Sequence, residues 1–427
     1  MYYKVTVFSV LILVVMYTII PATSNGDLSL IHGLEVTCEK LYFINYIHIV
    51  NSTINETLVL ETPGNISLPY GFKQTSLIVY QSEGLRFNET LGAIVFDVRE
   101  AESFTGYFVV ELNVCAPDRK TLFNYVALAQ IAPYLSTPPL SPNVPNNPPD
   151  VEHYLIQPHQ IVASRVKEDF ENWLDTTYRG VKPSNLSSFA LSVLAASFIY
   201  GYYIRYNASP YPRSIEDVVE TGTGDCDDMS RVLVELLNVY GIPSIMITGY
   251  DVVWNNYTID VEGFKYRYVN NGPHAFAAAY IQGVGWVSLD LLAGGMLTYP
   301  FIVEGYGRST TVNQTAVEEF KDLHKKIAGT QLMAVLKEDV VRGYLENRTL
   351  GELIRSLVEF EEENPVSTTT PISTNGEDVT LTPSPGESPA GNMRDSWKWV
   401  ILTVAIGAVF VFLSLLASRN IKKTRAR

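Results

Sequence analysis

Two proline-rich stretches limit how this chain can fold, because neither can join a packed core. Residues 137–150 (TPPLSPNVPNNPPD) hold six prolines in fourteen residues, a composition that favours an extended polyproline II spacer. Residues 363–392 are rich in Ser, Thr and Pro, with too few apolar residues to form a core. The sequence therefore predicts two folded segments, 25–132 and 151–362, with a linker at 133–150 between them and a stalk at 363–396 after them.

Each end of the chain carries an apolar segment. Lys4 precedes the apolar run 5–20, and small residues follow it, as in a signal peptide (1–24) cleaved after Ser24; an uncleaved signal anchor is the alternative. Residues 399–418 carry no charge and are long enough to cross a bilayer, with Trp397 and Trp399 at one end. The sequence predicts a transmembrane helix at 397–418. Five basic residues follow in the tail 419–427, which we expect to be cytoplasmic, leaving the bulk of the chain extracellular.

Charge and glycosylation signals agree with that location. Excluding Lys4 and the five basic tail residues takes the net charge from −14 to −20. An acidic surface argues against nucleic acid as a partner and favours solubility or a basic partner. Nine Asn-x-Ser/Thr sequons lie in the predicted outer part, at Asn51, Asn55, Asn65, Asn88, Asn185, Asn207, Asn256, Asn313 and Asn347.

The first segment reads as strands. LYFINYIHIV, TSLIVY, AIVFDV and YFVVELNV are separated by Asn, Gly and Pro turns, which predicts a small antiparallel, sandwich-like domain at 25–132. Cys38 and Cys115 lie near its two ends, and outside the cell a disulfide between them is the simplest expectation. Two buried free thiols are the alternative. Nothing in this segment indicates chemistry.

The second segment begins with helices. Apolar residues recur at helical spacing after Pro158, and the uncharged stretch 183–204 reads as a helix buried on all sides rather than a second membrane span. A helix is expected from Cys226 to about Tyr240, ending at Gly241. The strands IPSIMITGYDVV, FKYRYV, HAFAAAYIQ and GWVSLD follow, and residues 316–362 are expected to be helical. Helices followed by an antiparallel sheet predict an α+β domain.

Three linked motifs resemble the core of the transglutaminase-like superfamily, the papain-related Cys-His-Asp folds. They are GTGDCDDMS opening a helix that ends at Gly-Ile-Pro, PHAFAAAY, and GWVSLD, all within residues 155–295. The resemblance implies that Cys226 is the nucleophile, His274 the general base and acid, and Asp290 the residue that orients His274. It departs from the family pattern where Phe276 replaces the usual Trp and Leu291 follows the Asp.

The residues themselves support the same triad. A helix N-terminus favours a thiolate, because its unpaired N–H groups and the helix dipole attract negative charge. Asp225, Asp227 and Asp228 act against it, although Asp227 can pair with Arg231 one turn on. An imidazolium at His274 must therefore stabilise the thiolate. Asp225→Asn, which removes an anion, should favour it further.

A hairpin would bring the histidine and the aspartate together. His274 and Asp290 are sixteen residues apart, so a turn centred on Gln282 would place them opposite each other, with Cβ atoms about 5 Å apart. A turn centred on Val284 would separate them unless a bulge intervenes. We expect Gly224, Asp225, Phe276 and Trp286 to line the site.

The sequence offers no other chemistry. HExxH, CxxC pairs, a P-loop and the dinucleotide glycine pattern are absent, and the three aspartates lack the alternating spacing of a calcium loop. We therefore expect no cofactor and no metal. The leading hypothesis is a membrane-anchored extracellular thiol enzyme acting on a peptide, protein or cell-envelope amide, with hydrolysis favoured over crosslinking. The alternative is a non-catalytic surface scaffold or adhesion protein.

Overall fold

A computed structural model describes residues 36–363, apart from 51, 69–70, 118–121, 123–125, 128, 131–132, 134–150, 254–255, 293–300, 309 and 346–348. The predicted signal peptide, most of the linker, the stalk after 363, the transmembrane helix and the tail lie outside these residues. Within the described residues, no helix is both long and apolar enough to cross a membrane.

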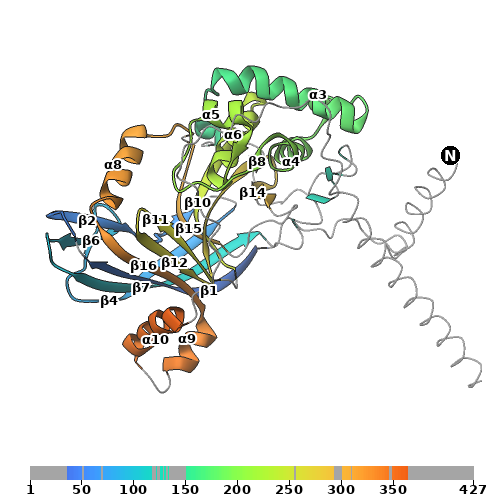
Figure 1. Ribbon diagram of the computed structural model, residues 1–427. Helices are drawn as coiled ribbons and strands as arrows, with labels where there is room; N and C mark the ends of the chain where they lie inside the picture. Colours follow the sequence, from blue (N-terminus) through green and yellow to red (C-terminus); the bar gives the residue numbers. More distant parts are fainter. Residues whose placement is uncertain are drawn as a thin grey trace, which may run out of the picture. The chain divides into compact units, whose positions relative to one another are not determined.

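The largest element is a seven-stranded sheet (Figure 1). Its strand order is β11 (Asn256–Val261), β12 (Phe264–Val269), β16 (Ala328–Lys337), β1 (Val36–Val50), β7 (Phe104–Pro117), β4 (Lys73–Gln81) and β3 (Ile66–Ser67). All neighbours are antiparallel except β12 and β16. A smaller sheet, made of β2 (Glu56–Glu61), β6 (Ala93–Val98) and β5 (Arg86–Asn88), shares a core with it.

The expected boundary between two independent domains is wrong. Strands β1, β7, β4 and β3 come from the first segment, whereas β11, β12 and β16 come from the second. The strand β16 was also missed, because residues 316–362 were expected to be helical. It pairs with β1 from Leu41–Lys337 to Val50–Ala328, which covers an edge that β1 would otherwise leave unpaired. The sandwich-like packing is present, but not as a separate domain.

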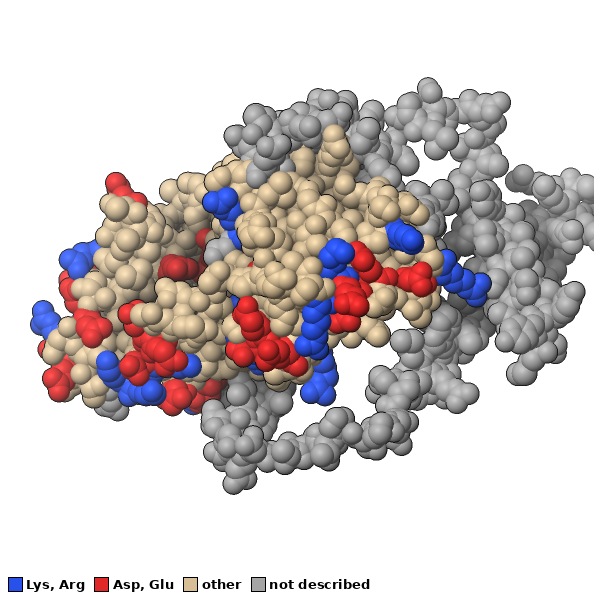
Figure 2. Space-filling view, turned by 90° about the horizontal axis from the view of Figure 1, so that it is seen from above, with Lys and Arg blue, Asp and Glu red and all other residues tan. Residues whose placement is uncertain are grey.

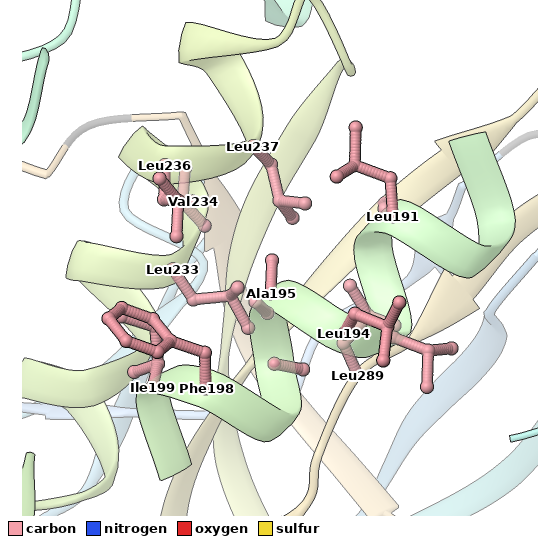
Figure 3. Close-up of a cluster of buried hydrophobic side chains, with 14 of the residues drawn as sticks. Leu191, Leu194, Ala195, Phe198, Ile199, Leu233, Val234, Leu236, Leu237 and Leu289 are labelled. Atoms are coloured by element: carbon pink, nitrogen blue, oxygen red, sulfur yellow. The ribbon is translucent and has the colours of Figure 1, made fainter. Parts of the chain in front are cut away.

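Helices of the second segment form a layer above the sheets (Figure 1). They are α3 (Lys167–Tyr178), α4 (Ser188–Phe198), α5 (Ile215–Thr221) and α6 (Cys226–Val239). Helix α4 is buried along almost its whole length, as expected for the uncharged stretch. Figure 3 shows its side chains, including Leu194 and Phe198, packing against Leu233 and Leu237 of α6. This apolar contact holds α6 against α4.

A four-stranded sheet lies against α6. Its order is β14 (Gly285–Ser288), β13 (Gly272–Ile281), β10 (Ser244–Asp251) and β15 (Phe301–Gly307). Ala277 and Ala279 face the helical layer, whereas Phe276 and Tyr280 pack with Phe72 of the first segment. Helices and antiparallel strands are thus layered as the α+β expectation requires. The small alanines allow α6 to approach the sheet closely.

Smaller elements complete the molecule. Helix α8 (Gln314–His324) stands beside β11 and β15 in Figure 1, and α9 (Glu338–Leu345) and α10 (Leu350–Glu363) cover the far side of the large sheet. A disulfide joins Cys38 and Cys115, the expected pairing, across a registered pair of β1 and β7. Of the nine sequon asparagines, five are exposed in the described residues: Asn55, Asn65, Asn185, Asn207 and Asn313.

Candidate active site

The nucleophile position is set by the turn that leads into α6. Helix α5 ends at Gly222, which has a positive φ of 61°, a conformation that glycine adopts without strain. The next residues form β9 (Thr223–Gly224), which pairs with β8 (Arg205–Tyr206). A Cβ atom at Gly224 would lie 2.8 Å from the Cβ of Asp228. Gly224 therefore lets the chain pass close to α6 and place Cys226 at its first position.

His274 reaches Asp290 by a different register from the one expected. Strand β13 pairs with β14 as Ile281–Gly285 and Ala278–Ser288, so the turn is centred on Gly283 rather than on Gln282. In this register Phe276, not His274, is opposite Asp290. The offset of two keeps His274 and Asp290 on the same face, and His274 Nε2 lies 2.8 Å from Asp290 Oδ2. The long imidazole spans the diagonal gap.

The third member of the triad lies beside the same histidine. Cys226 is close enough to His274 for its thiol and its charge to act on the pKa of the imidazole, and since Nε2 faces Asp290, Nδ1 is the nitrogen left to face the thiol. Burial lowers the pKa of His274, but the hydrogen bond to Asp290, the nearby Cys226 thiol and the charges of both groups outweigh it and raise the pKa to about 10. His274 is therefore an imidazolium at neutral pH, as the thiolate–imidazolium pair requires.

Two arginines neutralise most of the acidic charge beside Cys226. Arg231 is 3% exposed and pairs with both Asp227 (3.1 Å) and Asp228. Arg213 Nη1 donates to the second oxygen of Asp228 at 2.9 Å. The expected Asp227–Arg231 pair is confirmed, and Asp228 is the centre of a buried ion-pair network. Neither aspartate acts on the thiol as an isolated anion.

Asp225 is neutralised in another way. It is 5% exposed, and its Oδ1 has no hydrogen-bond partner. Burial, the adjacent carboxylate of Asp227 and the charge of Asp228 raise the pKa of Asp225 to about 9. Asp225 is therefore a protonated, uncharged acid at neutral pH. The residue preceding Cys226 adds no negative charge there.

Metal binding by these aspartates has little support. Single oxygen atoms of Asp225, Asp227 and Asp228 lie within 4.8 Å of one another, a spacing that could suit a cation. However, arginine nitrogens already occupy oxygens of Asp227 and Asp228. The carboxylate oxygens that a cation would need are therefore already engaged in an ion-pair network within the protein.

Of the two aromatic residues expected to line the site, one does so. The ring of Phe276 is stacked on that of His274, with centroids 6.3 Å apart, and Phe276 is fully buried. Trp286 does not line the site. It is opposite Tyr280, six residues along β13 from His274, or roughly 20 Å at the usual rise of a strand. There it packs against Tyr154 and Tyr280 in the core.

Sequence reasoning missed four residues around Cys226. The hydroxyl of Ser230 lies 2.6 Å from the carbonyl oxygen of Cys226 and 3.0 Å from the phenol oxygen of Tyr200. Burial and the negative charges of Asp290 and Cys226 raise the pKa of Tyr200. Tyr206 and Tyr257 also lie near the thiol, and its charge contributes to the raised pKa of each phenol, after burial. The only available signal was a tyrosine-rich stretch at 200–206.

Three comparisons place this chain among known proteins. Residues 188–291, which contain all three triad positions, match the model of the transglutaminase-like superfamily. No curated protein sequence matches the chain. A solved structure described as a "Putative Cysteine Protease" from Cytophaga hutchinsonii is 12% identical, covers 71% of this chain and 93% of its own, and has a TM-score of 0.42. The periplasmic domain of TgpA from Pseudomonas aeruginosa is 10% identical over 59% of this chain and 87% of its own, with a TM-score of 0.26.

Proposed function

Because residues 188–291 form a transglutaminase-like domain, we propose that the protein is a thiol enzyme that breaks an amide or peptide bond. One observation carries the proposal: His274 is hydrogen-bonded to Asp290, lies beside the Cys226 thiol and holds a proton at neutral pH. A scaffold would have no need to keep an imidazolium beside a thiol. We also propose that the enzyme faces outward from the cell on a single C-terminal membrane anchor.

The reaction follows from these groups. The Cys226 thiolate attacks the carbonyl carbon, forming an S–C bond, and the electron pair moves to the oxygen. When the C–N bond breaks, His274 gives its proton to the leaving nitrogen, and an amine and a thioester result. His274, now neutral, takes a proton from water as the water attacks the thioester. The C–S bond then breaks, its electron pair returns to the Cys226 sulfur as thiolate, and the acid is released. Asp290 keeps the imidazole oriented throughout.

We propose two donors for the oxyanion. The backbone N–H of Cys226 is at the first position of α6, where helix geometry leaves it without an intrahelical partner. For the second we propose Tyr206, because its backbone pairs with Gly224 two residues before Cys226 and its hydroxyl is near enough for the charge of Cys226 to act on it. Removing one such donor typically reduces turnover by roughly 100-fold to 1,000-fold.

The test of this function uses the single free thiol. Since Cys38 and Cys115 are joined, iodoacetamide should label only Cys226 in the intact ectodomain. We expect fast labelling at pH 6, well below the pKa of about 8.5 of an ordinary thiol, and a loss of at least tenfold in His274→Ala. The difference in labelling rate between the wild type and His274→Ala should shrink at pH 10, because an ordinary thiol is also ionised at that pH.

Turnover provides the second half of the test. Peptide and cell-envelope amide libraries should yield hydrolysis by the wild type and none by Cys226→Ala. Tyr206→Phe should reduce turnover but not alkylation by iodoacetamide, because that displacement forms no oxyanion. If the pH dependence of labelling is that of an ordinary thiol and is unaffected by His274→Ala, the protein is not a thiol enzyme. The non-catalytic scaffold would then be the better hypothesis.

A further inference from the structure

A tyrosine connects the catalytic residues to the large sheet. The hydroxyl of Tyr257 on β11 lies so close to Gly272 that a Cβ atom there would be 2.2 Å away. Gly272 is two residues before His274, so Tyr257 borders the site. Its ring stacks on that of Tyr268 on β12, with centroids 4.9 Å apart. The stacked rings of Tyr257 and Tyr268 therefore extend from the neighbourhood of Cys226 to β12.

The carboxyl group of Glu304 lies near these stacked tyrosines. Tyr250 on β10 donates a hydrogen bond of 2.8 Å to Glu304 Oε1 on β15. Gly249, next to Tyr250, pairs with His274 on one side and with β15 on the other. Glu304 is therefore two strands from His274, roughly 10 Å at the usual strand spacing. Tyr268 is near enough that the charge of Glu304 contributes to its raised pKa, after burial and Tyr257 and Tyr266.

Glu304 has no cationic partner. No ion pair found among the described residues includes it, and Tyr250 is the only hydrogen-bond partner seen there. Its Oε2 is not among the buried oxygens that lack a partner, and the side chain is half-buried, so this oxygen meets solvent. An unpaired carboxylate among protein atoms is costly unless a cation binds to it. Figure 2, a view from above, shows a hollow in the described surface with acidic side chains in its floor.

We propose that Tyr250, Tyr268 and Glu304 form a subsite for a cationic group of the substrate, an ammonium or guanidinium, carried about 10 Å from the amide that Cys226 attacks. The carboxylate supplies the charge, and the two buried tyrosines position it: Tyr250 donates a hydrogen bond to it, and Tyr268 packs beside it. This proposal rests on the proposed function, because only an enzyme has a substrate for the subsite to bind. Cation binding at the subsite can be tested without turnover, provided that a reagent can reach Cys226.

This cation is a recognition element and not the attacking amine of a crosslinking reaction. An amine must be neutral to attack a thioester, whereas Glu304 favours the protonated form. The separation of two strands is also too large for the bound nitrogen to reach the carbonyl carbon at Cys226. The subsite therefore selects substrates by charge and leaves the hydrolytic route unchanged.

The subsite should depend on pH. Burial, opposed by the hydrogen bond from Tyr250 and assisted by the charge of Glu61 on β2, raises the pKa of Glu304 to about 7. Tyr250, Tyr268 and Glu61 are the titratable groups identified around it, and both tyrosines stay neutral because their own pKa values are raised. Cation binding should therefore strengthen as the pH rises through 7.

The experiment compares two alkylating reagents that differ only in charge. N-(6-aminohexyl) iodoacetamide carries an ammonium on an arm long enough to reach Glu304, and N-heptyl iodoacetamide is its neutral counterpart, with a methyl group in place of the ammonium. At pH 8 the wild-type ectodomain should react with the cationic reagent about tenfold faster, the size of one hydrogen bond to a charged group. Glu304→Gln should bring the ratio close to one. Glu168→Gln, an exposed change on α3 with the same loss of charge, should not.

The outcomes separate the subsite from the enzyme. A ratio of one in the wild type, or a preference that survives Glu304→Gln, overturns the subsite. A preference that is lost in Glu304→Gln and kept in Glu168→Gln supports it, provided that the neutral reagent reacts equally with all three proteins. The triad is judged separately, by the effect of His274→Ala on the neutral reagent, so either idea can fail alone.

Discussion

Cys226 tolerates three acidic neighbours because the fold removes their charge by two different means. Arg231 and Arg213 form ion pairs with Asp227 and Asp228, whereas Asp225 is buried and holds a proton. From the sequence, Asp225→Asn was expected to favour the thiolate by removing an anion. With Asp225 already neutral, the same substitution should change Cys226 alkylation at pH 7 by less than about twofold.

The buried Asp225 carboxyl group should instead affect how the free energy of unfolding changes with pH. The folded-state pKa of Asp225, about 9, is above the ordinary value of 3.8. Its contribution is therefore complete below pH 3.8 and is lost as the pH rises towards 9. At about 1.36 kcal/mol per pKa unit, the wild type should lose as much as about 4 kcal/mol between pH 5 and pH 8 through this group. His274, with its raised pKa, acts in the same direction above pH 6.5.

Urea unfolding of the ectodomain at pH 5 and pH 8 measures this loss. Asp225→Asn cannot ionise, so its unfolding free energy should fall much less over that range and should exceed that of the wild type at pH 8. Asp175→Asn, at an exposed aspartate of α3, should retain the wild-type slope. Equal slopes for the wild type and Asp225→Asn would mean that Asp225 is ionised in the folded protein.

At the scale of elements, the first segment supports the catalytic one directly. Gln74 of β4 is 2% exposed, and its side chain binds both backbone groups of Val303: Nε2 donates to the carbonyl oxygen at 2.8 Å, and Oε1 accepts from the N–H at 2.9 Å. Phe43 of β1 packs on Tyr250, with ring centroids 5.0 Å apart. The strands that carry Glu304 and Gly249 are therefore held in place by residues 36–117.

This dependence predicts that the second segment cannot fold alone. Expressed without residues 25–132, the fragment 151–362 would expose the edge of β16 and the apolar residues of the shared core. We expect it to aggregate or to show no cooperative thermal transition by circular dichroism. Co-expression with 25–132 should restore a soluble complex that binds through β1 and β16. A monomeric 151–362 that unfolds cooperatively by itself would contradict the shared sheet.

At the scale of the whole molecule, the predicted orientation in the membrane can be tested on cells. The basic tail after residues 399–418 leads us to expect that residues 25–396 face outward. Protease added to intact cells should cut the stalk at 363–392 and release a fragment that still reacts with iodoacetamide at Cys226. Tagging the tail at 427 provides the control, because the tag should stay protected until the cells are opened. If the stalk resists cleavage in intact cells, the predicted orientation is wrong.

The sequence by itself determined the local features of this protein. The start of α6 at Cys226, its end near Gly241, the buried α4 and the strands around His274 follow from helix caps, apolar periodicity and turn residues. The triad residues could be named because three motifs stand in a known order. Each of these signals lies within a few residues of chain and needs no distant partner.

Only the tertiary structure decided which strands share a sheet and which acids carry charge. Strand pairing depends on backbone hydrogen bonds that any sequence can make, so nothing in β1 announced β16, which lies about 290 residues farther along the chain. The turn of the hairpin is centred one residue later than expected, and its pairing is shifted by two, for the same reason. The charge on Asp225 and Glu304 depends on burial and on neighbours from other elements. Such long-range terms arise only when the chain is folded.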